Sequence, residues 1–278
     1  MATRIFRFRA TEVCFTGGGA VFGWRDRTGK RLETMGQPVE ARGDFSLSPD
    51  GSRVAYVATL GSGPGDVWVL ELSSGLSTRI TFSNGVFPRW SPDGKHPYYA
   101  NPKGIHRKAA DGSGEEELVM KGGQSDLVGS VSPDGKYLPY GLSDILALPL
   151  IGERKPEPYL QTKYTERRAA YESDESGRQE IYVQGFPERR GKWLISAEGG
   201  RRPEWRADGK ELYWNGLDGT MMAASVELQA AALFRLPGQM NYFQPARDGR
   251  RFLVMEPEGE QQERPMVVLQ KWVERLGK

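Results

Sequence analysis

Few of the residues that carry out common enzyme chemistry occur in this sequence. Its 278 residues include one cysteine, Cys14, and two histidines, His96 and His106. One cysteine cannot form an internal disulfide, and a zinc site normally needs three or four His, Cys or carboxylate ligands. No serine stands in a G-x-S-x-G motif, the nucleophile signature of many hydrolases. We therefore expect no metal site and no cofactor, and we interpret Cys14 as a buried strand residue.

Long apolar runs and a strong net charge are also missing. The 38 Lys and Arg residues nearly balance the 36 Asp and Glu residues, and the net charge of +2 is too small to indicate nucleic acid or an anionic membrane surface as partner. No apolar run reaches the roughly 18 residues of a membrane span. The first ten residues, MATRIFRFRA, lack the hydrophobic core of a signal peptide. We expect no membrane insertion of this segment, so the chain is either cytoplasmic or exported and anchored by segments outside it.

One tetrapeptide recurs along the chain. Ser-Pro-Asp-Gly occupies residues 48–51, 91–94 and 132–135, and altered copies stand at 207–210 and 247–250. Pro presets φ, Asp bonds its own backbone and Gly supplies positive φ, so each copy predicts a tight turn. Successive turn aspartates lie 40 to 43 residues apart, apart from one gap of 74 residues that corresponds to two units. A period of about 40 residues is typical of propellers and solenoids.

Short β-rich runs after the turns favour a propeller. RVAYVA (53–58) and DVWVLEL (66–72) are followed by a polar turn and a further strand. With the strand that leads into each turn, the unit becomes four antiparallel strands, which is one propeller blade. We predict an all-β fold with one propeller domain over residues 1–278. Seven blades are favoured, and the alternative is a six-bladed ring in which both ends of the chain merge into one blade. TRIFRFR (3–9) and MVVLQKW (266–272) would pair to close the ring, and a closed ring with few free edges favours a monomer.

Several phrases in order resemble a known family. LSPDGSRVAYVA, PRWSPDGK, KAADGSGEEELV and GKWLISAEGGRRPEWRADGKELYW resemble the TolB-type propeller repeats attached to bacterial membrane-anchored Ser/Thr protein kinases. The resemblance covers nearly the whole chain. It implies a propeller outside the membrane that senses or binds a partner. It implies no phosphotransfer, because the kinase Gly-rich loop, HRD and DFG motifs are absent.

The chain also departs from the repeat. QTKYTERRAAYESDESGR (161–178) stands where another SPDG turn is expected, and about one strand is missing there. Pro97 and Pro139 stand inside runs that we interpret as strands, where proline removes a ladder donor. We therefore expect blades three to five to be irregular, with shortened or shifted pairing, above all around residues 161–178.

Candidate site residues come from the strands that line the central channel. Aligned on the turn aspartate, the residues four positions earlier are polar, and we expect them on the channel wall: Ser46, Arg89, Ser130, Glu204 and Gln244. Two positions further back, nearer the entrance, stand Asp44, Phe87, Val128, Arg202 and Tyr242. The preceding loops add Arg42, Gln124, Asp126, Arg167, Arg168, Arg201 and Asn241.

These residues support two readings of the channel mouth. In the favoured reading the chain is a non-catalytic module, a sensor or scaffold, whose mouth binds a protein or peptide through Arg89, Arg168, Arg202, Glu204, Asn241 and Tyr242. The arginines suit an acidic partner, because guanidinium groups match carboxylates in bidentate geometry. Alternatively the five arginines around the mouth pair with Glu40, Glu166 and Glu198 on the rim, and Arg89 pairs with Glu204 within the channel. These five arginines are Arg42, Arg167, Arg168, Arg201 and Arg202.

The second function class is an enzyme. Two carboxylates can perform acid/base work on a glycoside without cysteine or histidine. A hydrolase or lyase acting on a carbohydrate or ester would then use Asp44, Asp126, Glu166 and Glu204. A purely structural domain is the third possibility.

Overall fold

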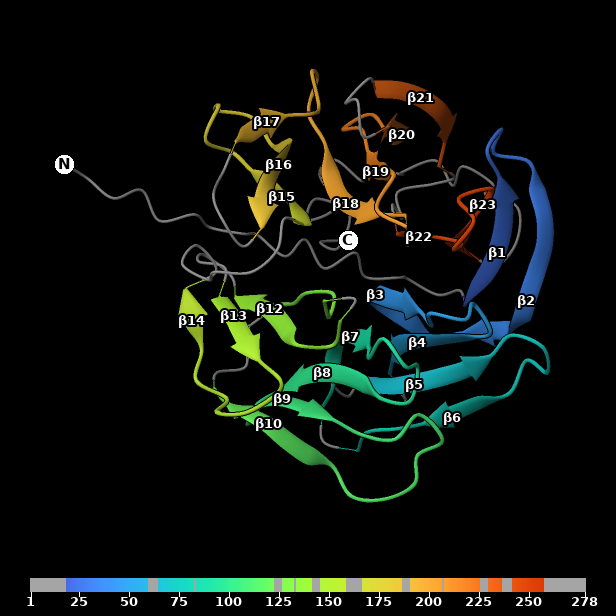
Figure 1. Cartoon of the computed structure of the whole chain (residues 1–278). Helices are drawn as coiled ribbons and strands as arrows, with labels where there is room; N and C mark the ends of the chain where they lie inside the picture. Colours follow the sequence, from blue (N-terminus) through green and yellow to red (C-terminus); the bar gives the residue numbers. More distant parts are fainter. Residues whose placement is uncertain are drawn as a thin grey trace, which may run out of the picture.

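The strands of the chain form antiparallel sheets that are arranged in a ring (Figure 1). The computed structural model describes residues 19–59, 65–82, 84–122, 127–132, 134–141, 146–158, 167–186, 191–206, 208–225, 230–236 and 242–257. These residues contain 23 strands and no helix. The all-β class and the propeller of small antiparallel sheets are therefore confirmed.

Five sheets have four strands each, and we call them blades. Blade 1 contains β3 (Ala41–Leu47), β4 (Arg53–Ala58), β5 (Asp66–Glu71) and β6 (Ser77–Arg79). Blade 2 contains β7 (Val86–Trp90), β8 (Pro97–Asn101), β9 (Gly104–Arg107) and β10 (Glu117–Lys121). Blade 3 contains β11 (Leu127–Val128), β12 (Tyr137–Gly141), β13 (Leu146–Pro149) and β14 (Glu157–Pro158). Blade 4 contains β18 (Arg201–Trp205), β19 (Glu211–Asn215), β20 (Thr220–Ser225) and β21 (Ala230–Arg235). The closing blade contains β22 (Phe243–Pro245), β23 (Arg251–Pro257), β1 (Ala20–Asp26) and β2 (Arg31–Val39).

A three-stranded sheet stands between blades 3 and 4. It consists of β15 (Arg167–Ser173), β16 (Glu180–Phe186) and β17 (Lys192–Leu194). The described residues thus form five complete blades, so the expected seven blades and the six-blade alternative are both wrong as counts of four-stranded blades. The three-stranded sheet falls at the segment where the repeat pattern breaks.

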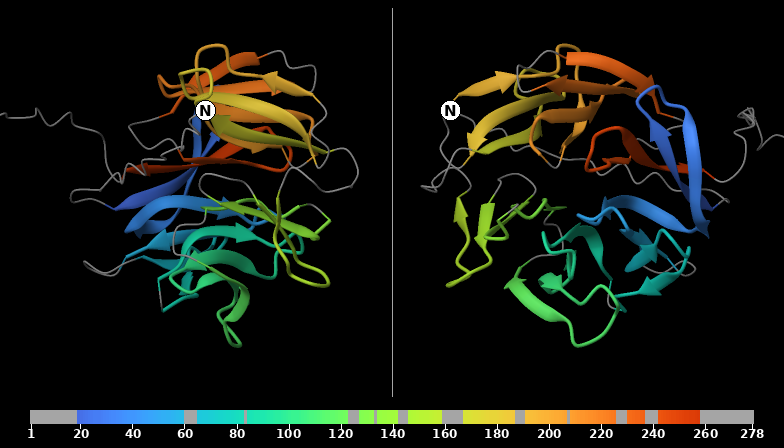
Figure 2. Two further views of the ribbon diagram at one scale, coloured as in Figure 1. Left: turned by 90° about the vertical axis from the view of Figure 1, so that its left-hand side faces the viewer. Right: turned by 45° about the vertical axis from the view of Figure 1, so that its right-hand side comes forward.

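The closing blade joins strands from both parts of the described chain. β1 pairs with β23 over seven residue pairs, from Ala20 opposite Pro257 to Asp26 opposite Arg251. β22 and β23 therefore come from the C-terminal part and β1 and β2 from the N-terminal part (Figure 2). The predicted pairing of residues 3–9 with residues 266–272 lies outside the described residues.

The five predicted turns share one backbone geometry. In the first, Gly51 N donates to Ser48 O at 2.9 Å, and Ser48 N donates to Arg53 O at 2.8 Å. Equivalent bonds recur in the other four turns, and the five turn glycines have φ between +66° and +75°. Asp50 Oδ1 accepts hydrogen bonds from Ser48 Oγ and from Ser52 N, which lowers the pKa of Asp50 to about 2. The turns all lie at one end of the channel, which we call the turn end; the opposite end, where each inner strand begins, is the crossover end.

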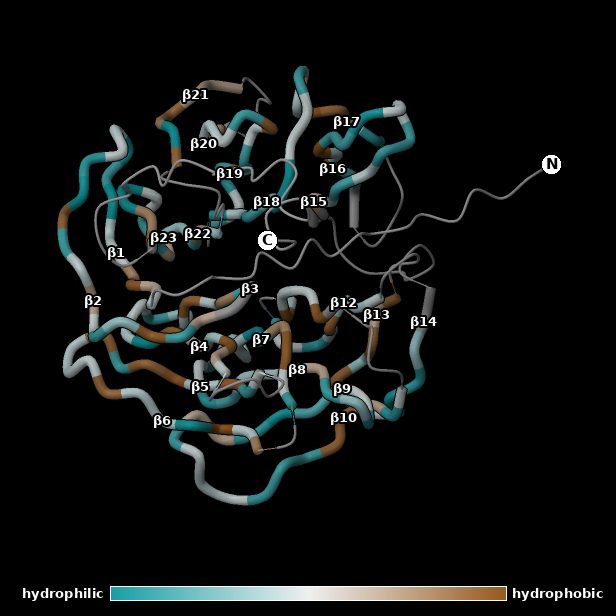
Figure 3. The backbone as a smooth tube through the Cα atoms, turned by 180° about the vertical axis from the view of Figure 1, so that it is seen from behind, coloured by the Kyte–Doolittle hydropathy of each residue, from teal (hydrophilic) through white to brown (hydrophobic). Residues whose placement is uncertain are grey.

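Among the described residues, buried apolar clusters join five pairs of neighbouring sheets. Hydrophobic residues are therefore spread around the ring instead of being collected in one centre (Figure 3). Between the closing blade and blade 1, Phe22 contacts Phe45 edge-on with ring centroids 5.1 Å apart. Between blade 4 and the closing blade, Tyr213 and Phe252 are 4.9 Å apart. This packing fixes the inner strands β3, β7, β18 and β22 around the channel (Figure 1).

Candidate binding site at the channel

Backbone bulges shape the crossover end of the inner strands. The pairing register shifts between Ala41 and Phe45 in β3, between Val86 and Arg89 in β7, and between Arg201 and Glu204 in β18. The shifts fall at equivalent positions of three blades, and bulges commonly re-aim side chains near functional sites.

Two of these bulges contain left-handed residues. Phe87 and Arg202 have φ of +55° and +57°, a region in which residues other than glycine are uncommon. Both residues stand six positions before the turn aspartate. Such conformations persist only where the surroundings enforce them, and they cluster at functional sites.

An ion pair joins blades 1 and 2 within the channel. Arg89 Nη2 donates to Asp44 Oδ2, and the side chains are only 15% and 19% exposed. Burial acts to lower the pKa of Arg89, but the negative charges of Asp44 and Glu204 outweigh it and raise that pKa. The ion-pair partner of Arg89 is thus Asp44, whereas the sequence suggested Glu204.

Glu204 instead bonds to the closing blade. Gln244 Nε2 donates to Glu204 Oε1 at 3.0 Å. Burial, with the nearby charge of Asp44, raises the pKa of Glu204 to about 7, although Arg89 and Arg202 oppose the shift. The channel therefore holds one carboxylate that is paired with an arginine and one that changes charge near neutral pH.

Arg202 and Tyr242 meet at the crossover end. The guanidinium carbon of Arg202 lies 3.5 Å from the centroid of the Tyr242 ring, a cation–π contact between blade 4 and the closing blade. The backbone N–H of Arg202 donates to Glu172 Oε1 at 2.6 Å. Burial raises the pKa of Glu172, against the influence of Arg202 and Arg201.

Sequence reasoning missed Glu172. The only signal for it is its place in the run RRAAYES, where it shares a strand face with Ala170. Within the described residues no ion pair joins Arg201 or Arg202 to Glu40 or Glu198, so the alternative rim pairing is not formed there.

The remaining predicted site residues are only partly described. Asp126, Glu166 and Asn241 lie outside the described residues, and Arg168 belongs to β15 without a described side chain. The structure therefore brings together Asp44, Arg89, Glu204, Arg202 and Tyr242 of the predicted set. It adds Gln244 and Glu172.

A small pocket opens toward the turn end of the channel. Its volume is about 120 Å³, and its lining includes Leu47, Pro49, Glu204, Trp205, Gln244 and Arg247. Sites for small-molecule ligands usually enclose about 300–1,000 Å³. This pocket is well below that size, and it is too small to enclose a sugar ring with its substituents.

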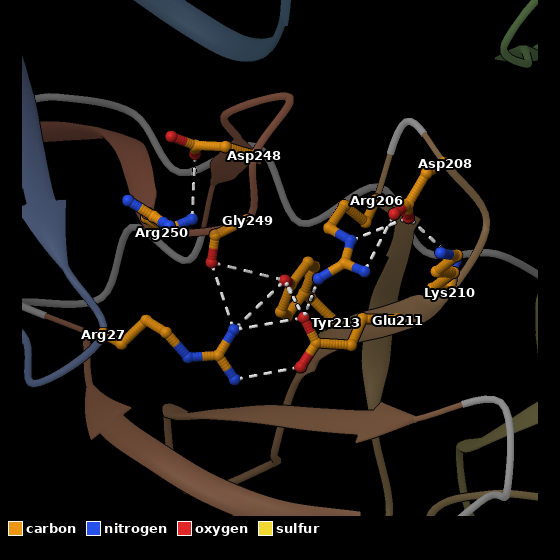
Figure 4. Close-up of polar contacts among 9 residues, drawn as sticks. All are labelled: Arg27, Arg206, Asp208, Lys210, Glu211, Tyr213, Asp248, Gly249 and Arg250. Atoms are coloured by element: carbon orange, nitrogen blue, oxygen red, sulfur yellow. Dashed lines mark hydrogen bonds and ion pairs between the residues drawn. The ribbon is translucent and has the colours of Figure 1, made fainter.

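A polar cluster joins blade 4 to the closing blade at the turn end (Figure 4). Arg27 donates to both carboxylate oxygens of Glu211 at 3.0 and 3.1 Å and to Gly249 O at 3.1 Å. Arg206, which replaces the serine of the SPDG motif, donates to Asp208 and to Glu211. Each of these groups has a partner, so the cluster serves to hold the two blades together.

Neither histidine lies in a metal-binding group. His106 is buried, its Nδ1 lies 3.2 Å from Gly104 O, and its ring stacks on Tyr99 at 6.2 Å. Within the described residues no three His, Cys, Asp or Glu side chains form a group suited to a metal ion. That part of the chain also has no helix long and apolar enough to cross a membrane.

Comparison with known proteins identifies the fold. No protein-family model and no curated protein matches the sequence. Among solved structures, a putative TolB from Agrobacterium tumefaciens superposes with a TM-score of 0.68 at 17% identity, covering 88% of this chain and 100% of that chain. TolB from Acinetobacter baumannii superposes with a TM-score of 0.56 at 16% identity, covering 88% of this chain and 64% of that chain. An oligogalacturonate lyase from Vibrio parahaemolyticus superposes with a TM-score of 0.54 at 12% identity, covering 84% of this chain and 78% of that chain. The chain has the TolB-type β-propeller fold.

Proposed function

We propose that the chain is a non-catalytic binding module that captures an acidic segment of a protein or peptide at the crossover end of its channel. The observation that carries this proposal is the placement of Arg202. Its guanidinium carbon lies over the Tyr242 ring, and its side chain has no carboxylate partner among the described residues; the neighbouring Arg201 is exposed. A guanidinium held by an aromatic face keeps its donors free for an incoming carboxylate.

The arrangement of the channel also supports binding over catalysis. Asp44, one of the candidate catalytic acids, is neutralised by Arg89, and the pocket beside Glu204 is small. An extended peptide needs only a surface and a few charged anchors, because its own backbone supplies further hydrogen bonds.

The proposal is tested with a defined acidic probe. Binding of a ten-residue Glu/Asp peptide to the full chain is measured by fluorescence anisotropy for wild type, Arg202→Glu and Arg235→Glu. Arg235 is exposed at the end of β21, on the rim of the same blade, and is the matched control. We expect a loss of affinity of at least about tenfold for Arg202→Glu, equivalent to about 1.4 kcal/mol, and less than a twofold change for the control. Equal affinity in all three proteins would refute the proposal.

A second candidate function rests on Glu204. A carboxyl with a pKa of about 7 is suited to general acid/base work at neutral pH. We propose as the alternative a hydrolase or lyase that acts on a carbohydrate or ester. Turnover of oligogalacturonate and of simple esters, with loss of that turnover in Glu204→Gln, would support it; no turnover by the wild-type chain would remove it.

A further inference from the structure

The small pocket toward the turn end of the channel is built from positions that repeat from blade to blade. Residues four positions before the turn aspartate supply its polar floor, residues three positions before supply apolar walls, and residues one position before stand at its rim. In this order they are Glu204 and Gln244, then Leu47, Trp205 and Pro245, then Pro49 and Arg247. Blade 1, blade 4 and the closing blade therefore all contribute to this pocket.

The floor of the pocket presents hydrogen-bond acceptors. Gln244 Nε2 donates to Glu204 Oε1 at 3.0 Å, which fixes the two side chains relative to each other. Within the part of the chain that the structure describes, Glu204 Oε2 and Gln244 Oε1 accept no hydrogen bond. The ion-pair partner of Arg89 is Asp44, so Arg89 does not pair directly with Glu204. A protonated amine combines a positive charge with several N–H donors, so it is the group that this floor is suited to hold.

Arg247 places a positive charge at the rim of the same pocket. It is exposed, and its side chain makes no ion pair or hydrogen bond with other described residues. The turn does not require an arginine, because the three SPDG copies have proline at this position and Arg247 N donates no backbone bond to the described residues. The guanidinium therefore has donors available for a carboxylate.

The volume and the walls limit the size of a ligand. The pocket of about 120 Å³ corresponds to about four water molecules, which leaves room for about five to seven non-hydrogen atoms. Leu47, Trp205 and Pro245 offer apolar contact between the two charged ends. A matching ligand is therefore small and carries opposite charges at its two ends.

We propose that this pocket binds a small zwitterionic α-amino acid such as glycine or L-alanine. Glu204 and Gln244 hold the ammonium group, Arg247 binds the carboxylate, and the Cα with its methyl group packs against the apolar walls. An amine alone leaves Arg247 without a partner, and a carboxylate alone brings a like charge toward Glu204, so neither matches both ends. The site is independent of the proposed capture of an acidic segment at the crossover end.

Calorimetric titration of the full chain with L-alanine tests the proposal. The variants are Glu204→Gln, Arg247→Gln and Arg247→Pro, the last of which restores the residue found in the three SPDG turns. Arg250→Gln is the matched control, because Arg250 is exposed on the same turn and does not line the pocket (Figure 4). We expect a loss of affinity of at least about tenfold in the three variants and less than about a twofold change in the control. Equal affinity in all of them, or no binding of L-alanine and glycine by wild type, would overturn the proposal.

A panel of related compounds tests the match of charge and size. Ethylamine carries only the ammonium group, propionate carries only the carboxylate, and L-tryptophan carries both with a side chain too large for the pocket. We expect each to bind wild type at least about tenfold more weakly than L-alanine. Binding of any of the three as tightly as L-alanine would contradict the assignment.

Proton release gives a readout that unspecific binding does not produce. Glu204 has a pKa of about 7 before the ligand binds, in the presence of Asp44 from β3, Arg89 from β7 and Arg202 from β18. An ammonium group favours the charged carboxylate, so binding lowers this pKa. At pH 7 we expect release of about half a proton per L-alanine, measured in two buffers of different ionisation enthalpy, and none in Glu204→Gln. Proton uptake, or no exchange in wild type, would contradict the role of Glu204.

Discussion

At the residue scale, Asp44 and Glu204 show how neighbours set the chemistry of two similar side chains. Asp44 receives a charged hydrogen bond from Arg89, whereas Glu204 receives a neutral one from Gln244. The pKa of Glu204 is raised to about 7 mainly because burial penalises its charged form. Glu204 is therefore a channel group whose charge responds to pH in the neutral range.

The stability of the protein is expected to fall as pH rises through the range set by Glu204. Its pKa is about 7 in the folded chain against an ordinary value of 4.5, so the folded state holds the proton more tightly. The resulting stabilisation is complete below pH 4.5 and is lost as pH rises to about 7. Glu204→Gln should remove this dependence and stabilise the protein at pH 8 by about 1–2 kcal/mol. Urea unfolding at about pH 5 and about pH 8 measures the effect.

Glu198→Gln is the control for this prediction. Glu198 is exposed, so its substitution should leave the pH dependence as in wild type. An unchanged pH dependence in Glu204→Gln would show that the carboxyl keeps an ordinary pKa.

The ion pair in the channel should behave as a coupled unit. Arg89→Met leaves Asp44 buried without its counter-charge and is expected to destabilise the fold by about 3 kcal/mol. Asp44→Asn combined with Arg89→Met should cost less than the sum of the single changes by about 1–3 kcal/mol. Denaturant unfolding of the two single variants and the double variant gives the coupling energy. Strict additivity would mean that the two side chains do not interact.

Alignment of the repeats placed these residues correctly on the inner strands but did not predict their partners. Counting back from the turn aspartate identifies the residues four and six positions earlier as channel-facing, because side chains alternate regularly along a strand. The bulges in β3 and β7 break that regularity and bring Asp44 to Arg89. A bulge depends on contacts between blades, which a single sequence does not display.

At the element scale, the turns are the most local and the most predictable part of the fold. Asp50 and Gly51 satisfy the turn through contacts within a few residues, so the three SPDG motifs and their two altered copies identify all five turns from the chain alone. Pro97 and Pro139 remain within β8 and β12, since the carbonyl oxygens of these prolines still accept backbone bonds. The irregular sheet of β15, β16 and β17, which has three strands among the described residues, falls where the sequence shows a break in the repeat.

Two glycines separate conformational cost from steric cost. Gly51 has φ of +75° and open space where a Cβ would lie, so Gly51→Ala should cost only about 1–2 kcal/mol for the left-handed backbone. Gly104 has φ of +141°, and a Cβ there would lie 2.1 Å from Met120 O. Gly104→Ala should therefore cost at least roughly twice as much, because β9 must separate from β10. Thermal unfolding of both variants compares them; equal losses would contradict this account.

At the scale of the whole molecule, the number of blades depends on how the ends combine. In the favoured seven-blade arrangement, the repeat length of about 40 residues assigned the two ends to separate units, whereas the six-blade alternative merged them into one blade. In the structure, residues 20–39 and 243–257 share one closing blade. Which strand pairs with which across the whole chain is a long-range property, and periodicity alone does not determine it.

The junction between blade 4 and the closing blade should be sensitive to salt. Arg27→Ala removes a bidentate ion pair with Glu211 and a bond to Gly249 O (Figure 4). Because Arg27 is 38% exposed, we expect a loss of only about 1 kcal/mol at low salt and less at about 1 M salt. Arg250→Ala is the control, since its exposed side chain is outside this ion pair. Equal destabilisation by the two variants in urea unfolding would show that the contacts of Arg27 do not stabilise the junction between these two blades.

The pairing of β1 with β23 also determines how the molecule responds to mechanical load. Ala20 and Pro257 stand opposite each other at one end of a seven-pair antiparallel ladder. A force that pulls these two residues apart loads the hydrogen bonds one after another, so the ladder unzips and does not shear. The ring would therefore open at low force at this seam while the other blades, which are each built from one continuous segment, stay folded.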